Sequence, residues 1–377
     1  MRARRAVHRV LGPAGPLLIA AAVAAVPAAP AEAITASAAP AAVLTGTGVL
    51  DDVVAVTATN AWAVGHSGPL SNPRTLVEHW NGTAWHRVSV RPAAGWLDGV
   101  AATSAGDVWA VGFSGLKALI LHFDGTRWRR VADPAAGSAF TLLAGVTAIS
   151  PRNAWAAGNT GNKTLIAHWN GTAWKRVPSP TPQSQSFLSG ISAASARDAW
   201  AVGGSSKTLI LHWNGTRWRH VPSPSPGPGA MLNDVTAISA GDAWATGSSA
   251  RGTLILHWNG TAWRRARSPA IRSGAGLVGI SGTSARNVWA VGATGGLAAS
   301  AARPTRAAAG PASEPLVLHW NGTTWSRIVI RRPANGGQLI GVHAASGQNA
   351  WAVGCTKTFA NRAARPLVLH WNGTAWH

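Results

Sequence analysis

Residues 195–221 read SARDAWAVGGSSKTLILHWNGTRWRHV, and variants of this stretch recur along most of the chain. A W-A-x-G element occurs seven times, in strict alternation with seven copies of an H-[WF]-[ND]-G-T element. The tryptophans of the first element stand at 62, 109, 155, 200, 244, 289 and 351, and the histidines of the second at 79, 122, 168, 212, 257, 319 and 370. The first five intervals between these tryptophans are 44 to 47 residues, which indicates one supersecondary unit copied seven times.

Each unit is predicted to form four strands, called a to d in chain order. In the fourth unit the predicted strands are 188–194, 199–202, 208–213 and 216–221. Asn-Gly between the last two is typical of a two-residue hairpin, because a type I′ turn needs positive φ at both central positions. Such a turn sets Trp213 opposite Thr216 and Leu211 opposite Trp218. Leu211, Trp213 and Trp218 are therefore expected to share one buried face.

Helices are not expected, because Gly, Pro or Asn-Gly interrupts every window of helical length. Seven four-stranded units of about 45 residues suit a β-propeller, whose blades bury both faces against their neighbours. The predicted fold is all-β, a propeller of seven four-stranded antiparallel blades. Three tryptophans per blade are expected to supply most of the core between blades.

The N-terminus is typical of a secretory signal peptide. Arginines at 2, 4, 5 and 9 precede an apolar run at 17–26, and Ala31-Glu32-Ala33 offers a cleavage site. The predicted organisation is a signal peptide (1–33), an Ala/Pro-rich flexible segment (34–43) and a propeller (44–377). The repeats are placed at 44–95, 96–139, 140–186, 187–230, 231–275, 276–337 and 338–377. The mature protein is expected to be secreted or cell-wall associated, monomeric, and without stable membrane insertion.

Charge and cysteine content limit the partners. The formal charge is +21, and loss of residues 1–33 leaves +18. Such a field favours anionic partners such as wall polymers and acidic polysaccharides, although it also serves solubility. Cys355 is the only cysteine, which excludes an intrachain disulfide and a zinc site built on several cysteines.

The alternating motifs resemble those of the propeller superfamily that includes kelch, WD40 and Asp-box (BNR-type) repeats. They look most similar to Trp-rich repeats exported by actinobacteria, with S-x-x-[DN]-[AV]-W-A-V-G alternating with H-W-N-G-T-x-W. The resemblance implies the fold and leaves the function open, because propellers serve enzymes, lectins and scaffolds alike. Sialidase and galactose-oxidase propellers use Tyr, and this chain contains none.

The repeated His and Asx residues are predicted to be structural. One His per blade at an equivalent position is spread around a ring, so these side chains do not converge on a metal ion. The Asx that precedes each W-A-x-G element sits in the turn between strands a and b, where Asx side chains commonly bond the backbone two residues on. No metal, cofactor or catalytic residue is predicted.

The most informative surface is the face that carries the b–c loops and the d–a connections, called the loop face below. Chain length varies mainly in the b–c loops, and variable loops on a rigid scaffold commonly carry function. Basic residues directly precede six c strands, and three acidic residues lead into a strands nearer the axis. The candidate binding residues are Arg74, Lys117, Lys163, Lys207, Arg251, Arg365, Asp51, Asp98 and Asp234.

The predicted function is an exported, non-catalytic binding propeller for an anionic polysaccharide or cell-wall polymer. One alternative is a polysaccharide lyase or hydrolase that uses carboxylates near the central channel, where hydrolysis requires a suitably spaced pair. Another is a scaffold for a second exported protein. Ring closure also has two solutions, since either residues 42–49 pair beside the short last strand or the chain lacks a C-terminal piece.

Overall fold

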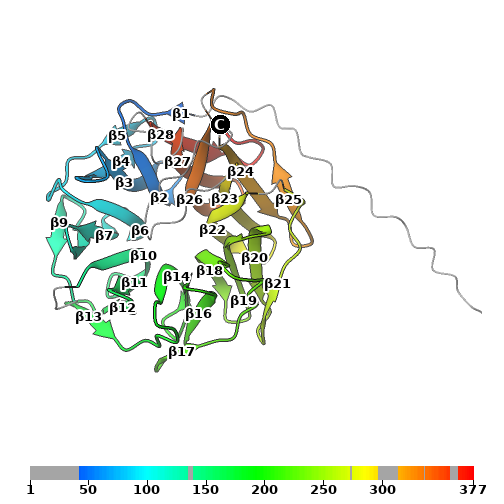
Figure 1. Cartoon of the computed structure of the whole chain (residues 1–377). Coiled ribbons are helices and arrows are strands. Elements are labelled where there is room, and N and C mark those ends of the chain that lie inside the picture. Colours follow the sequence, from blue (N-terminus) through cyan, green and yellow to red (C-terminus); the bar gives the residue numbers. More distant parts are fainter. Residues whose placement is uncertain (1–41, 135–138, 272–273, 296–312, 335, 357–363) are drawn as a thin grey trace, which may run out of the picture. The chain divides into compact units, whose positions relative to one another are not determined.

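The computed structural model describes residues 42–134, 139–271, 274–295, 313–334, 336–356 and 364–377. These residues form seven four-stranded antiparallel sheets, each running outward from a common axis, and they contain no helix (Figure 1). The predicted all-β propeller is confirmed. The predicted signal peptide, most of the flexible segment and most of the insertion at 295–314 lie outside the described residues.

The innermost strand of each blade lines the axis, and the second strand carries the W-A-x-G element. The inner strands are β2 (Val49–Thr57), β6 (Trp96–Ser104), β10 (Thr141–Ser150), β14 (Phe187–Ser195), β18 (Met231–Ser239), β22 (Gly276–Ser284) and β26 (Gly337–Ser346). The second strands are β3 (Asn60–Ser67), β7 (Asp107–Ser114), β11 (Asn153–Thr160), β15 (Asp198–Gly204), β19 (Asp242–Ser249), β23 (Asn287–Thr294) and β27 (Asn349–Thr356).

The two outer strands of each blade flank the Asx-Gly turn. The third strands are β4 (Arg74–Trp80), β8 (Lys117–Phe123), β12 (Lys163–Trp169), β16 (Thr208–Trp213), β20 (Gly252–Trp258), β24 (Glu314–Trp320) and β28 (Pro366–Trp371). The outermost strands are β5 (Trp85–Arg87), β9 (Trp128–Val131), β13 (Trp174–Val177), β17 (Trp218–His220), β21 (Trp263–Arg265), β25 (Trp325–Ile328) and, in the last blade, β1 (Ala42–Val43).

The glycine of W-A-x-G is required by a bulge in the inner strand. In the fourth blade the pairing of β14 with β15 shifts register between Leu188 and Gly190, which leaves one residue unpaired. A Cβ on Gly203 would lie 2.1 Å from the Phe187 carbonyl oxygen, so no larger residue fits there. All seven blades show the same register shift. The bulge therefore explains why the repeat keeps this glycine.

The Asn-Gly turn is longer than the sequence prediction. Trp213 pairs directly with Trp218, so the two-residue hairpin that sets Trp213 opposite Thr216 is wrong. The Asn214 Oδ1 accepts the backbone N–H groups of Thr216 and Arg217, both at 3.1 Å, and Gly215 adopts φ 90°. The Asn214 N–H also donates to the Arg217 carbonyl at 3.4 Å, so the side chain accepts the N–H groups that this single backbone bond across the turn leaves over. Trp213 and Trp218 still share a face, because they are now a cross-strand pair.

Tryptophans from adjacent blades form seven equivalent clusters. Trp200 of the fourth blade lies 4.9 Å from Trp258 and 5.1 Å from Trp263 of the fifth, measured between ring centroids. Trp351 of the last blade makes the same contacts with Trp80 and Trp85 of the first, at 5.2 Å each. Because large buried rings remove much apolar surface from water, these clusters hold each blade against the next.

The last blade is completed from two segments of the chain. At one end of β28, Ala42 pairs with Val368 and Val43 with Leu367. At its other end, His377 exchanges two backbone hydrogen bonds of 2.9 Å with His370. Trp376, only 2% exposed, fills the cluster position beside Trp289. The N-terminal segment therefore joins the last blade, although it pairs with β28 and not with the short last segment, and this pairing connects the first and last parts of the ring.

Candidate functional site: the loop face and the axis

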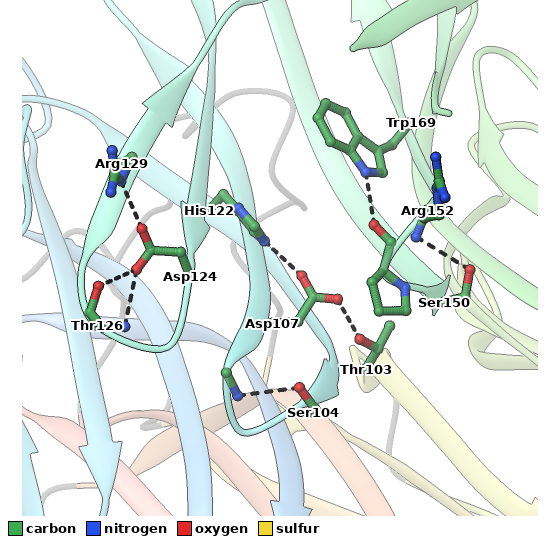
Figure 2. Close-up of polar contacts among 12 residues, drawn as sticks. Thr103, Ser104, Asp107, His122, Asp124, Thr126, Arg129, Ser150, Arg152 and Trp169 are labelled. Carbon is green, nitrogen blue, oxygen red and sulfur yellow. Dashed lines mark hydrogen bonds and ion pairs between the residues drawn. The ribbon is translucent and has the colours of Figure 1, made fainter. Parts of the chain in front are cut away.

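The repeated His and Asx side chains bond to each other. His122 Nε2 lies 2.6 Å from Asp107 Oδ1, and the Asp107 carboxylate also accepts the Thr103 hydroxyl (Figure 2). His–Asx bonds of this kind occur in blades two to seven. The repeated Asx therefore bonds a side chain, whereas the sequence analysis expected a backbone partner two residues on. That backbone contact is made instead by the first turn residue, as in the bond from Gly106 N–H to Ser104 Oγ.

Each repeated His also packs against the W-A-x-G tryptophan of its own blade, as His122 stacks on Trp109 at 4.1 Å between ring centroids. A ring held by a stacked indole on one side and an Asx oxygen at its edge has a packing role. Among the described residues, no group of three or more His, Cys, Asp or Glu side chains is arranged to hold a metal ion.

Basic residues mark the loop face. The side chains that directly precede or begin six of the third strands are all exposed; they are Arg74, Lys117, Lys163, Lys207, Arg251 and Arg365. They stand at equivalent places in blades one to five and seven, at the ends of the b–c loops. The six residues selected from the sequence therefore lie on the loop face. They are distributed around it, one per blade, and do not gather at one point.

The selected acidic residues lie on inner strands. Asp51 and Asp98 are the unpaired bulge residues of β2 and β6, because the register shifts fall between Leu50 and Asp52 and between Leu97 and Gly99. Asp234 occupies a different position, since Asn233 is the bulge residue of β18. The residue equivalent to Asp234 in the first blade is Asp52, which is not among the candidate binding residues named from the sequence. Both residues stand ten positions before the W-A-x-G tryptophan of their blade, Trp62 and Trp244, so the spacing of the repeat also aligns them.

Asp52 and Asp234 connect neighbouring blades at the axis. Asp52 accepts the backbone N–H of Val53 at 2.8 Å and that of Val100 in the next blade at 2.9 Å. Asp234 makes the same two bonds, to Val235 and to Ile280 of the next blade. In the other five blades this position is Gly. A Cβ on Gly190, for example, would lie 2.8 Å from the Asp234 Cα. Close approach of the inner strands thus restricts where a side chain fits.

Burial sets the protonation of these carboxyl groups. It raises the pKa of Asp52 to about 8, with the charge of Asp234 adding to the shift and the Val100 N–H opposing it. Burial likewise raises the pKa of Asp234 to about 7 and that of Asp98 well above its usual range. Asp51 is also raised by burial, against the opposing effect of His66, whose Nδ1 lies 3.0 Å from Asp51 Oδ2. The part of the loop face nearest the axis therefore carries less negative charge than four ionised carboxylates would give it.

The structure also brings together four aromatic rings that are far apart in the sequence and that no repeated motif connects. His66 stacks on Trp96 with centroids 3.4 Å apart, Trp96 on Phe113 at 5.9 Å, and Phe113 meets Phe140 edge-on at 5.5 Å. These four residues, called the aromatic row below, lie at the loop-face ends of β2–β3, β6–β7 and β10. Trp96 is the one tryptophan outside the per-blade clusters. That exception, together with the rarity of Phe, was the signal in the sequence.

No protein-family model and no curated protein match the chain. Solved structures do. YCF48 bound to D1 peptide aligns with a TM-score of 0.59 and 16% identity over 91% of this chain and 99% of that one. The protein is a seven-bladed β-propeller.

Two further solved propellers align similarly. YCF48 from Cyanidioschyzon merolae has a TM-score of 0.58 and 18% identity over 88% of this chain and 99% of its own. The structure of U3-55K has a TM-score of 0.58 and 11% identity over 87% and 98%. At these identities the likeness shows the propeller fold alone. The described residues contain no helix long and apolar enough to cross a membrane.

Proposed function

We propose that this propeller is an exported, non-catalytic binding module that holds an acidic segment of another protein on its loop face. The observation that carries the proposal is the set of six exposed basic side chains at equivalent places on that face. A peptide-bound propeller among the solved structures of the same fold adds support for a protein partner. Propellers present loops on a rigid ring, which suits binding without chemistry.

The hydrogen bonds at the axis support a non-catalytic role. Asp52 and Asp234 each use both carboxylate oxygens to accept backbone N–H groups, one of them from the next blade. Asp51 is 8% exposed and paired with His66. Carboxyl groups in such positions hold inner strands together. A hydrolase would instead need a pair that is free to reach a scissile bond.

A second candidate ligand is an anionic polysaccharide or cell-wall polymer. The observation that favours it is the near-regular placement of the basic residues, one per blade in six blades, which suits a polymer with repeating negative charge. Both ligand classes would bind through charge, and both predict that affinity falls as salt screens the contacts. The two ligand classes differ in the uncharged groups that accompany their negative charges.

The test compares the full chain with a Lys117→Gln/Lys163→Gln/Lys207→Gln variant. Binding of a short Glu-rich peptide and of polygalacturonate is measured by fluorescence anisotropy at low and moderate salt. We expect saturable binding that the triple variant weakens on the order of tenfold or more, because three screened ion pairs are lost. The exposed Arg129→Gln/Arg130→Gln variant on β9 is the control. Equal loss in that control would mean that net charge, and not the loop face, determines binding.

A further inference from the structure

The aromatic row is confined to one sector of the loop face. At the first cross-strand pair of β6 and β7 the residues are Trp96 and Phe113. The equivalent pair in the sixth blade is Gly276 and Ala293, and the fourth blade has Phe187 opposite Gly204. The blades are alike in their outer strands, so packing of the repeat does not require large rings here. Their presence in blades one to three needs another explanation.

This sector also exposes apolar surface. Leu116, in the b–c turn of the second blade, is 63% exposed, and Phe140 is 38% exposed. The Leu116 carbonyl accepts the backbone N–H of Thr141 at 2.9 Å, so the two exposed side chains belong to adjoining segments. Leu70 in the b–c loop of the first blade is 39% exposed. Three of the four large apolar side chains that are exposed among the described residues therefore belong to blades one to three, and exposed apolar surface gathered in one region indicates a binding surface.

Backbone contacts place basic residues beside the row. Lys117 follows Leu116 directly. Gly161, two residues before Lys163, donates its N–H to the Phe140 carbonyl at 2.8 Å. Arg74 forms a bridge with Ala94, two residues before Trp96. The described charges in the loops of this sector are mainly positive: Arg74, Arg91, Lys117 and Lys163, with Asp133 as the acidic residue.

We infer that the aromatic row is the anchor point of the loop face and that the partner is an extended acidic protein segment with a large apolar side chain, such as Trp, between its acidic residues. The inference rests on the proposed function and adds to it the chemistry of the ligand. The apolar side chain packs against Trp96, Phe113, Phe140 and Leu116, while the flanking carboxylates meet Arg74, Lys117 and Lys163. Aromatic anchors surrounded by charges are typical of protein interfaces.

The row is built to be rigid on its inner side. His66 is 3% exposed, bonded to Asp51 and stacked under Trp96, so the indole is held from below before any ligand arrives. A preorganised ring loses little side-chain entropy on binding, which favours affinity per unit of buried surface. A solvated loop would give no such advantage. This support explains why a buried His replaces the residues found at the equivalent place of other blades, such as Gly204 and Ala293.

The experiment measures binding of two synthetic peptides to the full chain at low salt. Both are short and Glu-rich, and they differ only in a central Trp or Ser. We expect the Trp peptide to bind about tenfold more tightly, a difference of about 1.4 kcal/mol. In the Leu116→Ser/Phe140→Ser variant this preference should fall below about twofold, because the apolar contact is removed. Both residues are surface exposed, so the variant is expected to fold.

Val329→Ser is the matched control, since Val329 is 48% exposed but follows β25 in the sixth blade. It should keep the preference for Trp. Lys117→Gln/Lys163→Gln should weaken both peptides equally and leave their ratio unchanged. That combination of results supports the inference.

Two results would overturn it, and only the first of them would leave the proposed function standing. One is equal, Lys117- and Lys163-dependent binding of both peptides. The other is tighter binding of polygalacturonate than of either peptide, with a loss in the Leu116→Ser/Phe140→Ser variant, which would make the row a platform for sugars. If neither peptide nor polygalacturonate binds, the proposed function itself fails.

Discussion

The outer half of each blade and the loop-face end of the inner strands differ in how far they repeat. In the outer half, Trp clusters recur between all seven pairs of blades, and His–Asx bonds recur in six blades. At the loop-face ends of the inner strands, the equivalent positions hold Val49, Trp96, Leu142, Phe187, Met231, Gly276 and Gln338.

The difference separates residues that serve the fold from residues that serve this particular protein. A closed ring needs a close contact at every interface, because one weak interface would open it, and the interface between blades one and two meets this need with Phe123 in place of a tryptophan. A binding surface has no such requirement and is free to be asymmetric. The aromatic row belongs to the second class, and the variants below test this division.

The largest effect is expected for Trp200→Ala. Trp200 is fully buried between Trp258 and Trp263, so its truncation leaves a cavity and should lower the free energy of unfolding by about 3–5 kcal/mol. Trp96→Ala should cost only about 1–2 kcal/mol, because Trp96 is partly exposed and outside the clusters. Denaturant unfolding of both variants measures the difference. Equal losses in the free energy of unfolding would show that Trp96 serves the fold, as Trp200 does.

A smaller effect on the free energy of unfolding, dependent on pH, is expected to distinguish blades in which the repeated His bonds to Asn from those in which it bonds to Asp. Burial lowers the pKa of His319, bonded to Asn287, to about 4, so the stability from neutral His319 is complete above about pH 6.5 and is lost as pH falls toward 4. Asn287→Asp would recreate the second blade, where Asp107 pairs with His122 and Thr103 donates to it. Relative to wild type, this variant should gain about 1 kcal/mol at pH 5 compared with pH 8, after allowance for solvent screening.

Unfolding curves at both pH values measure that gain. An unchanged difference between wild type and Asn287→Asp at the two pH values would show that the Asx charge does not reach the imidazole.

The smallest effect is expected for Asp124→Asn. Six blades have Asn at this turn position, and Asp124 Oδ1 makes the same bonds to Thr126 and Arg127 that Asn214 Oδ1 makes in its own turn. The variant loses only the exposed contact to Arg129. The Tm should change by no more than about 2 °C near neutral pH. A larger fall in a thermal melt would mean that the carboxylate charge matters to this turn.

Much of the fold was predictable because the repeat is local. The spacing of W-A-x-G and H-W-N-G-T specifies strand order, blade number and the cross-strand Trp213–Trp218 face, even though the turn between those two residues was predicted with the wrong length. The error arose because Asn-Gly signals a turn but does not report whether the Asn side chain accepts N–H groups beyond it.

By itself, the sequence determined the seven-bladed architecture, the basic residues of the loop face and the structural role of the repeated His. The residues that decide each of these features lie within a single repeat unit. Only the tertiary structure decided which unlike residues meet. Asp52 and Asp234 each bonded the backbone of the next blade, the ring closed through β1, and His66, Trp96, Phe113 and Phe140 came together from three blades. These contacts join positions whose spacing follows no local period, so they exist only once the blades have packed around the axis.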